Sequence, residues 1–138
     1  MTQIDYRELF DTVKTFAVVG YSDKPARAGH FVPAYLRQAG YNVIAVNPQY
    51  GDEVDGLPCY ASLAEIPADM QVDVVDIFRA PQHLPGVLDD ALAMAQRPRY
   101  FWMQPGAEHP ETAAAAAEAG MTSIMHACAL AEHKKLGQ

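Results

Sequence analysis

The 138-residue chain contains 50% hydrophobic and 20% charged residues, which is the balance of an ordinary globular protein and argues against disorder. Its formal net charge of −7 argues against nucleic acid as the main partner, because phosphate contacts need clustered lysines and arginines. No apolar run approaches the roughly 20 residues of a membrane-spanning helix, and acidic residues interrupt the region where a secretory leader would lie. We therefore expect one cytoplasmic domain over residues 1–138, with Cys59 and Cys128 reduced.

Strand and helix patterns alternate through the first half of the chain. In order, the patterns predict a helix over residues 4–15, a strand over 16–20, a helix over 29–39, a strand over 41–46 and a polar loop over 49–58. The helical spacing of Phe31, Val32, Tyr35 and Leu36 predicts the buried face of the second helix, and Gly40 ends that helix.

The alternation continues in the second half. The patterns predict a helical turn over residues 62–66, a strand over 72–78, a helix over 84–95, a strand over 99–104, a helix over 111–119, a strand over 122–126 and a short terminal helix. Nearly continuous apolar strands that alternate with helices indicate a parallel sheet covered on both faces. The predicted fold is therefore α/β, a single doubly wound, mainly parallel, Rossmann-like sheet.

The segment after the first strand is the first candidate binding site, because ligands of such sheets lie at the carboxyl ends of the strands. It contains Gly20, Tyr21, Ser22, Lys24 and Arg27. A glycine lets backbone approach a phosphate, a serine hydroxyl can donate to it, and the two cations can pair with it. The spacing of the glycines does not match G-x-G-x-x-G, and a plain turn carrying surface cations is the alternative. We favour a phosphate site.

Asn47 and Pro48 end the second strand, where an NAD-binding protein of the usual kind carries an acidic residue. A carboxylate there would repel a phosphorylated ribose, so its absence favours NADP or coenzyme A over NAD. A simple Asn-Pro turn is the alternative. Two further strand ends offer side-chain or backbone contacts to a ligand, namely Phe78 with Arg79, and Gln104 with Gly106.

No catalytic or metal-binding constellation is visible in the sequence. The five histidines are scattered, with no spacing typical of a metal site. His126 and Cys128 would share one face if the last strand continued, but a packed thiol is more plausible than a nucleophile pair.

Several segments in order carry a family resemblance: residues 17–22, Arg27, 43–48, 60–63, 72–79 and 102–106. Together they resemble the small bacterial CoA-binding proteins, which are similar to the CoA-binding N-terminal domain of the succinyl-CoA synthetase α subunit. The resemblance implies a Rossmann-like domain that holds CoA by its 3′-phospho-ADP end. By that resemblance Gly20, Ser22, Lys24 and Arg27 meet the phosphates, Asn47 and Pro48 border the adenosine, and Phe78 and Arg79 form the other side of the groove.

The sequence departs from the family in one segment, because His126-Ala127-Cys128 stands where relatives often have Asp-Arg-Cys. It also lacks the phosphorylated-histidine segment of the synthetase, so the resemblance gives no support to ligase activity. We expect non-covalent binding of CoA or an acyl-CoA, with no catalysis of its own and with a protein partner and oligomeric state left open. The alternatives are an NADP-binding, oxidoreductase-like protein and a protein that exchanges thiols with CoA through Cys128.

Overall fold

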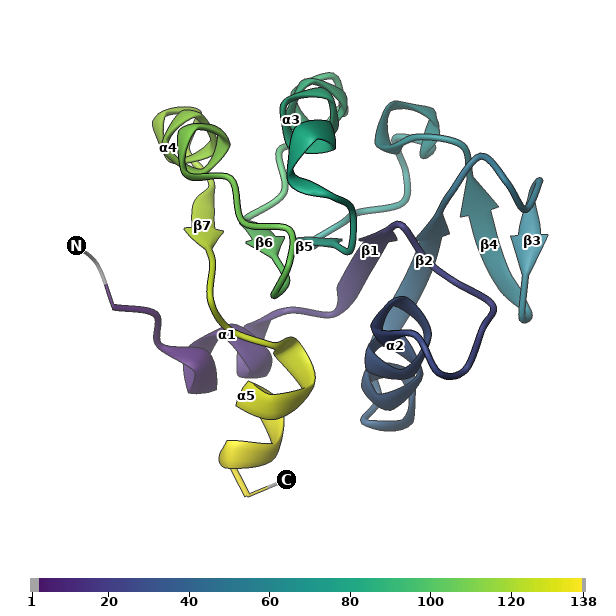
Figure 1. The fold of residues 1–138 in the computed structure, drawn as a ribbon, viewed down its shortest axis with the longest axis horizontal. Helices are drawn as coiled ribbons and strands as arrows, with labels where there is room; N and C mark the ends of the chain where they lie inside the picture. The colour runs from purple at the N-terminus through teal and green to yellow at the C-terminus, as the bar shows by residue number, and fades with distance from the viewer. Residues whose placement is uncertain (1–2, 138) are drawn as a thin grey trace.

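The computed structural model describes residues 3–137 and contains one seven-stranded sheet in the order β3-β4-β2-β1-β5-β6-β7 (Figure 1). The strands are β1 (Thr15–Val19), β2 (Asn42–Val46), β3 (Glu53–Val54), β4 (Leu57–Tyr60), β5 (Val74–Ile77), β6 (Tyr100–Met103) and β7 (Thr122–Ile124). The helices are α1 (Tyr6–Thr12), α2 (Ala28–Gln38), α3 (Leu84–Leu92), α4 (Pro110–Glu118) and α5 (Ala129–Lys135), with 3₁₀ turns η1 (Leu63–Glu65) and η2 (Pro81–His83).

Every strand pair is parallel except β3 with β4. β1 lies between β2 and β5. The chain places β2, β3 and β4 on one side of β1, and then β5, β6 and β7 on the other side. The position between β1 and β5 is therefore the topological switch point, where α/β sheets bind ligands. The doubly wound, Rossmann-like fold predicted from the sequence is confirmed.

Helices cover both faces of the sheet, with α3 and α4 on one face and α1, α2 and α5 on the other (Figure 1). The alternation of side chains along each strand divides the core accordingly. Ala17, Val75 and Phe101 pack under α3 and α4, whereas Val18 and Trp102 pack under the opposite layer. No helix within residues 3–137 is long and apolar enough to cross a bilayer.

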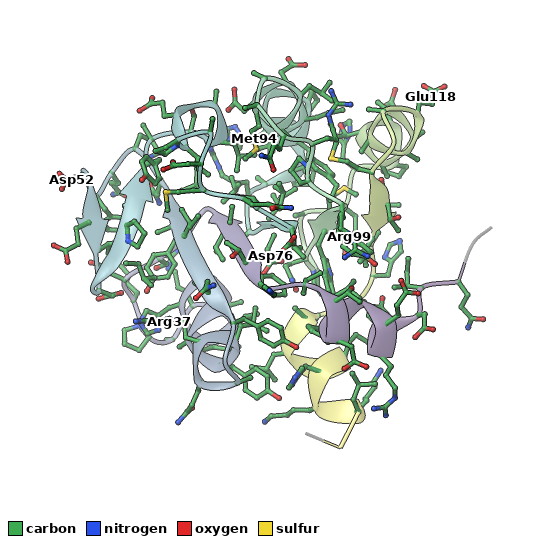
Figure 2. All side chains as sticks on the ribbon, turned by 180° about the vertical axis from the view of Figure 1, so that it is seen from behind. Arg37, Asp52, Asp76, Met94, Arg99 and Glu118 are labelled. Carbon is green, nitrogen blue, oxygen red and sulfur yellow. The ribbon has the colours of Figure 1, made fainter. Side chains whose placement is uncertain are left out.

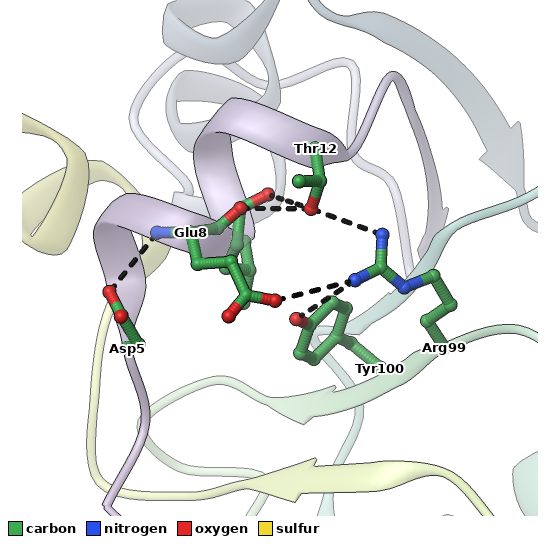
Figure 3. Close-up of polar contacts among 6 residues, drawn as sticks. Asp5, Glu8, Thr12, Arg99 and Tyr100 are labelled. Atoms are coloured by element: carbon green, nitrogen blue, oxygen red, sulfur yellow. Dashed lines mark hydrogen bonds and ion pairs between the residues drawn. The ribbon is translucent and has the colours of Figure 1, made fainter.

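A polar cluster fastens α1 to the start of β6 (Figure 3). The Asp5 side chain caps α1 by accepting from the Glu8 N–H at 3.1 Å. Arg99 donates to the Thr12 hydroxyl at 3.0 Å and lies 3.9 Å from the Glu8 carboxylate. Its guanidinium also lies 5.2 Å from the centre of the Tyr100 ring. These contacts hold α1 at the edge of the sheet where the strands begin. Gly20 lies at the opposite edge, directly after the end of β1.

Two sequence predictions about strands are wrong. Residues 49–58 are not a loop, because β3 and the start of β4 form a hairpin there. Asp55 and Gly56 both have positive φ, 53° and 78°, as a two-residue type I′ turn requires. The last strand ends at Ile124, before His126 turns into the left-handed region with φ 66°. His126 and Cys128 therefore do not share a strand face.

Two helix predictions also need correction. The first helix spans only Tyr6–Thr12, because Thr15 already pairs with Asn42 as the start of β1. Phe31 does not belong to the buried face of α2, since it is 45% exposed while Val32 is buried. Neighbouring residues differ by about 100° around a helix, so these two side chains face different surroundings.

Candidate ligand-binding site

Two adjoining pockets lie at the carboxyl ends of the strands and share Gly20, Phe78 and Arg79. The first, the β2-side pocket, has a volume of about 270 Å³ and reaches from Asn47 and Pro48 to α3. The second, the β6-side pocket, has a volume of about 430 Å³ and is further lined by Ser22, Arg27, Ala28, Gly29, Ala80 and Pro105–Ala107. The shared residues make one continuous site across the switch point.

Three backbone segments approach one another closely at Gly20, whose φ is 85°. A Cβ placed on Gly20 would lie 2.7 Å from the carbonyl oxygen of Phe78. A Cβ on Gly29 would lie 2.8 Å from the carbonyl oxygen of Gly20. Only glycine fits at both positions, so the start of α2 packs directly against the turn after β1. The sequence analysis missed Gly29, because its distance from Gly20 does not match the usual fingerprint.

A proline inside α2 frees a carbonyl that the loop uses. Pro33 has no N–H to donate to the Gly29 carbonyl four residues earlier, as an ordinary helical residue would. The Ser22 N–H donates to that carbonyl instead, at 3.2 Å. The Ser22 hydroxyl in turn accepts from the Lys24 N–H at 3.1 Å, which leaves the hydroxyl proton available to a ligand. The loop after β1 is thereby tied to the helix that follows it.

Positive charge gathers at this edge although the whole chain is acidic. The charged groups of Lys24, Arg27 and Arg79 form no hydrogen bond or ion pair with any residue that the structure describes. Arg27 and Arg79 line the pockets, whereas Lys24 lines neither. Arg27 is also the N-cap of α2, whose N-terminus has no side-chain cap and no acidic residue in its first turn. Free cations and an uncapped helix N-terminus together favour an anion.

The side chains of Asn47 and Tyr21 are engaged with neighbouring chain. Asn47 Nδ2 donates to the Tyr21 carbonyl at 2.9 Å, and Asn47 Oδ1 accepts from the Gln49 N–H at 2.9 Å. Tyr21 is only 3% exposed, lines neither pocket, and donates its hydroxyl to Asp55 Oδ2 at 2.7 Å. Asn47 thus borders the β2-side pocket while it holds the loop after β1.

Gln104 and Gly106 were predicted together but have different surroundings. Gly106 lines the β6-side pocket. The Gln104 side chain is buried, donates to Asp76 Oδ1 and accepts from the Ala129 N–H at 3.3 Å. Asp76 lies in the interior (Figure 2), and no described residue hydrogen-bonds its second carboxylate oxygen. Burial raises the pKa of Asp76 to about 7, against the opposing effect of the Gln104 hydrogen bond.

The β2-side pocket also contains residues that the sequence analysis did not name as binding residues. Ser62 and Asp90 contribute polar groups, and Val87 contributes an apolar wall. Burial, followed by the negative charge of Asp89, raises the pKa of Asp90. Asp90 lies within α3, where no motif distinguishes it in the sequence, whereas Ser62 lies just before η1 in one of the segments that carry the family resemblance.

Within residues 3–137, no three or more His, Cys, Asp or Glu side chains gather in a group that could hold a metal ion. Cys59 is buried and Cys128 is half-buried at the N-cap of α5, and no disulfide joins them. Burial raises the pKa of the Cys59 thiol. His126 Nδ1 lies 3.8 Å from Glu108 at the exposed edge of the β7–α5 connection.

The chain is similar to several known proteins. A family model described as a CoA binding domain matches residues 14–134. The uncharacterized protein YneT of Bacillus subtilis is 37% identical over 132 residues, covering 96% of this chain and 94% of YneT. The structure of cell-free ID.343 from Thermus thermophilus is 39% identical with a TM-score of 0.81, over 96% of this chain and 99% of that one.

A larger enzyme contains a similar domain. Acetyl-coenzyme A synthetase 1 of Ca. Korarchaeum cryptofilum, in its apo form, is 28% identical with a TM-score of 0.68. The match covers 86% of this chain but 27% of the synthetase chain.

Proposed function

Because the chain belongs to the family of CoA-binding domains and is related to a domain of acyl-CoA synthetases, we propose that it binds coenzyme A or an acyl-CoA non-covalently, without a reaction of its own. The observation that carries the proposal is the pair of pockets joined at Gly20, Phe78 and Arg79 beside unpaired cations. An elongated ligand with an anionic middle is the kind of molecule that such a site suits.

In this proposal the adenosine lies in the β2-side pocket, bordered by Asn47 and Pro48. The diphosphate crosses Gly20 and the N-terminus of α2, where the Ser22 hydroxyl and Arg27 meet it. Arg79 lies between the two pockets and neutralises phosphate charge. The pantetheine arm runs along Pro105–Ala107 in the β6-side pocket, where an acyl group would extend toward solvent.

Calorimetric titration with CoA, dephospho-CoA and ADP tests the proposal. Arg27→Gln and Arg79→Gln should each weaken CoA binding by about 10- to 100-fold, because a charge-assisted hydrogen bond is worth about 1.5–3 kcal/mol. The matched control is Arg37→Gln, in the last turn of α2 (Figure 2) and outside both pockets. Absence of CoA binding below millimolar concentration, or equal losses in all three variants, would refute the proposed site.

NADP is a second candidate, because Asn47 replaces the carboxylate that would repel a phosphorylated ribose. Binding of NADPH with little affinity for CoA would favour that candidate.

Acetyl-CoA incubated with the protein should remain intact, since the proposal includes no catalysis. A mass increase of one CoA on Cys128 in non-reduced protein would instead support thiol exchange.

A further inference from the structure

The loop after β1, residues 20–27, is held by the segment that leads into and forms the β3–β4 hairpin. The Tyr50 hydroxyl accepts a hydrogen bond from the Asp23 N–H and donates one to the Asp23 carboxylate, both at 3.2 Å. Asn47 donates to the Tyr21 carbonyl at 2.9 Å. Asn47, Tyr50 and Asp55 therefore all hydrogen-bond to residues of the loop, although each pair is at least 26 positions apart in the sequence.

Asp55 is the centre of these contacts. Its Oδ2 accepts from the Tyr21 hydroxyl at 2.7 Å and lies 3.6 Å from His30 Nε2. One carboxylate oxygen thus joins the hairpin, the loop and the first turn of α2. The position of this oxygen depends on the type I′ turn, in which Asp55 has a φ of 53°. Burial and the hydrogen bond to Asp55 raise the pKa of Tyr21 above its ordinary value.

Neither Tyr21 nor Asp55 lines either of the two pockets. The residues that do line them, Gly20, Ser22 and Arg27, belong to the loop that Tyr21 anchors. A loop already ordered in the free protein loses less conformational entropy when a ligand binds, and so binds it more tightly.

We propose that Tyr21 and Asp55 are positioning residues, through which the β3–β4 hairpin holds the loop of residues 20–27 in the geometry that receives the diphosphate of the ligand. This inference rests on the proposed function and extends it to two residues that lie outside both pockets. It gives the antiparallel hairpin at the edge of the sheet a role in binding.

Calorimetry with CoA and ADP on full-length variants tests the inference. Tyr21→Phe removes only the hydroxyl and should weaken binding of both ligands by the same factor, about 3- to 10-fold. Asp55→Ala should do the same, whereas Asp55→Asn should retain most of the affinity, since asparagine tolerates positive φ and still accepts from the tyrosine. Glu53→Gln is the matched control in the hairpin, because the Glu53 side chain makes no hydrogen bond with a described residue.

Amide hydrogen exchange in the absence of ligand separates this inference from the proposed function. Tyr21→Phe should speed exchange in residues 20–30 and leave β6 unchanged, as a local loss of order predicts. Wild-type affinity in Tyr21→Phe, or unchanged exchange in residues 20–30, would overturn the positioning role. A wild-type protein that binds no CoA would refute the proposed function, and exchange alone would then decide whether Tyr21 orders the loop.

Discussion

The buried carboxyl of Asp76 should make the stability of this protein depend on pH in a way that one substitution removes. Asp76 is fully buried, Gln104 donates to one of its oxygens, and no described residue hydrogen-bonds the other. Its pKa rises from 3.8 to about 7 in the folded protein. The folded state therefore holds a proton that the unfolded state releases near pH 4, and this contribution to stability is lost as the pH rises to 7.

The magnitude follows from this rise in pKa. At about 1.4 kcal/mol for each pH unit, the free energy of unfolding of the wild type should fall by up to about 4 kcal/mol relative to Asp76→Asn between pH 4 and pH 7. Above pH 7 the difference should stay constant. The amide introduced by Asp76→Asn cannot ionise and is nearly the same size as the carboxyl, so the comparison isolates the carboxyl from other titrating groups.

Urea unfolding of both proteins at four values between pH 4 and pH 8 measures this difference. Asp69→Asn is the matched control, because Asp69 is exposed and its replacement should produce no comparable pH trend. A difference between wild type and Asp76→Asn that stays constant over this range would refute the reasoning, since Asp76 would then titrate alike in both states.

Two further substitutions test the backbone geometry. Gly29→Ala would place a Cβ 2.8 Å from the Gly20 carbonyl and should lower CoA affinity in calorimetry by about tenfold or more, because the loop must move. Gly86→Ala is its control in α3: nothing lies within 4 Å of that Cβ, so unfolding should show unchanged or higher stability and calorimetry unchanged affinity. Asp73→Ala should destabilise the fold by about 1–3 kcal/mol in urea unfolding, because its carboxylate accepts from the N–H groups of residues 14 and 15 at 2.8 and 3.0 Å. Equal stability of Asp73→Ala and wild type would contradict that role.

Local patterns were sufficient to predict most of the sheet. The apolar runs that became β1, β2, β5 and β6 were found because strands buried on both faces need apolar side chains at nearly every position. Gly40 ends α2 with a φ of 107°, as its sequence position indicates. The hairpin was missed although Asp55-Gly56 is a typical type I′ pair, because its flanking strands are short and the second contains Pro58.

The candidate site was predicted only in part from the sequence. Gly20, Ser22, Arg27, Asn47, Pro48, Phe78, Arg79 and Gly106 line the pockets, as expected of residues at the carboxyl ends of parallel strands. Whether those residues contact CoA stays a prediction. Gln104 was placed in the same group by its position alone, but the strand alternation turns its side chain into the core.

The amino-acid sequence by itself determined the alternation of strands and helices and the turns at which ligand-facing loops begin, because those depend on residues close together in the chain. The tertiary structure alone decided which loop residues line the pockets and which ones are hydrogen-bonded to the segment of the β3–β4 hairpin. Tyr21 and Asp55 meet across 34 residues of sequence, and that contact depends on the order of the strands and the path of the hairpin. Side-chain spacing along one segment cannot encode a distance between two segments that only packing brings together.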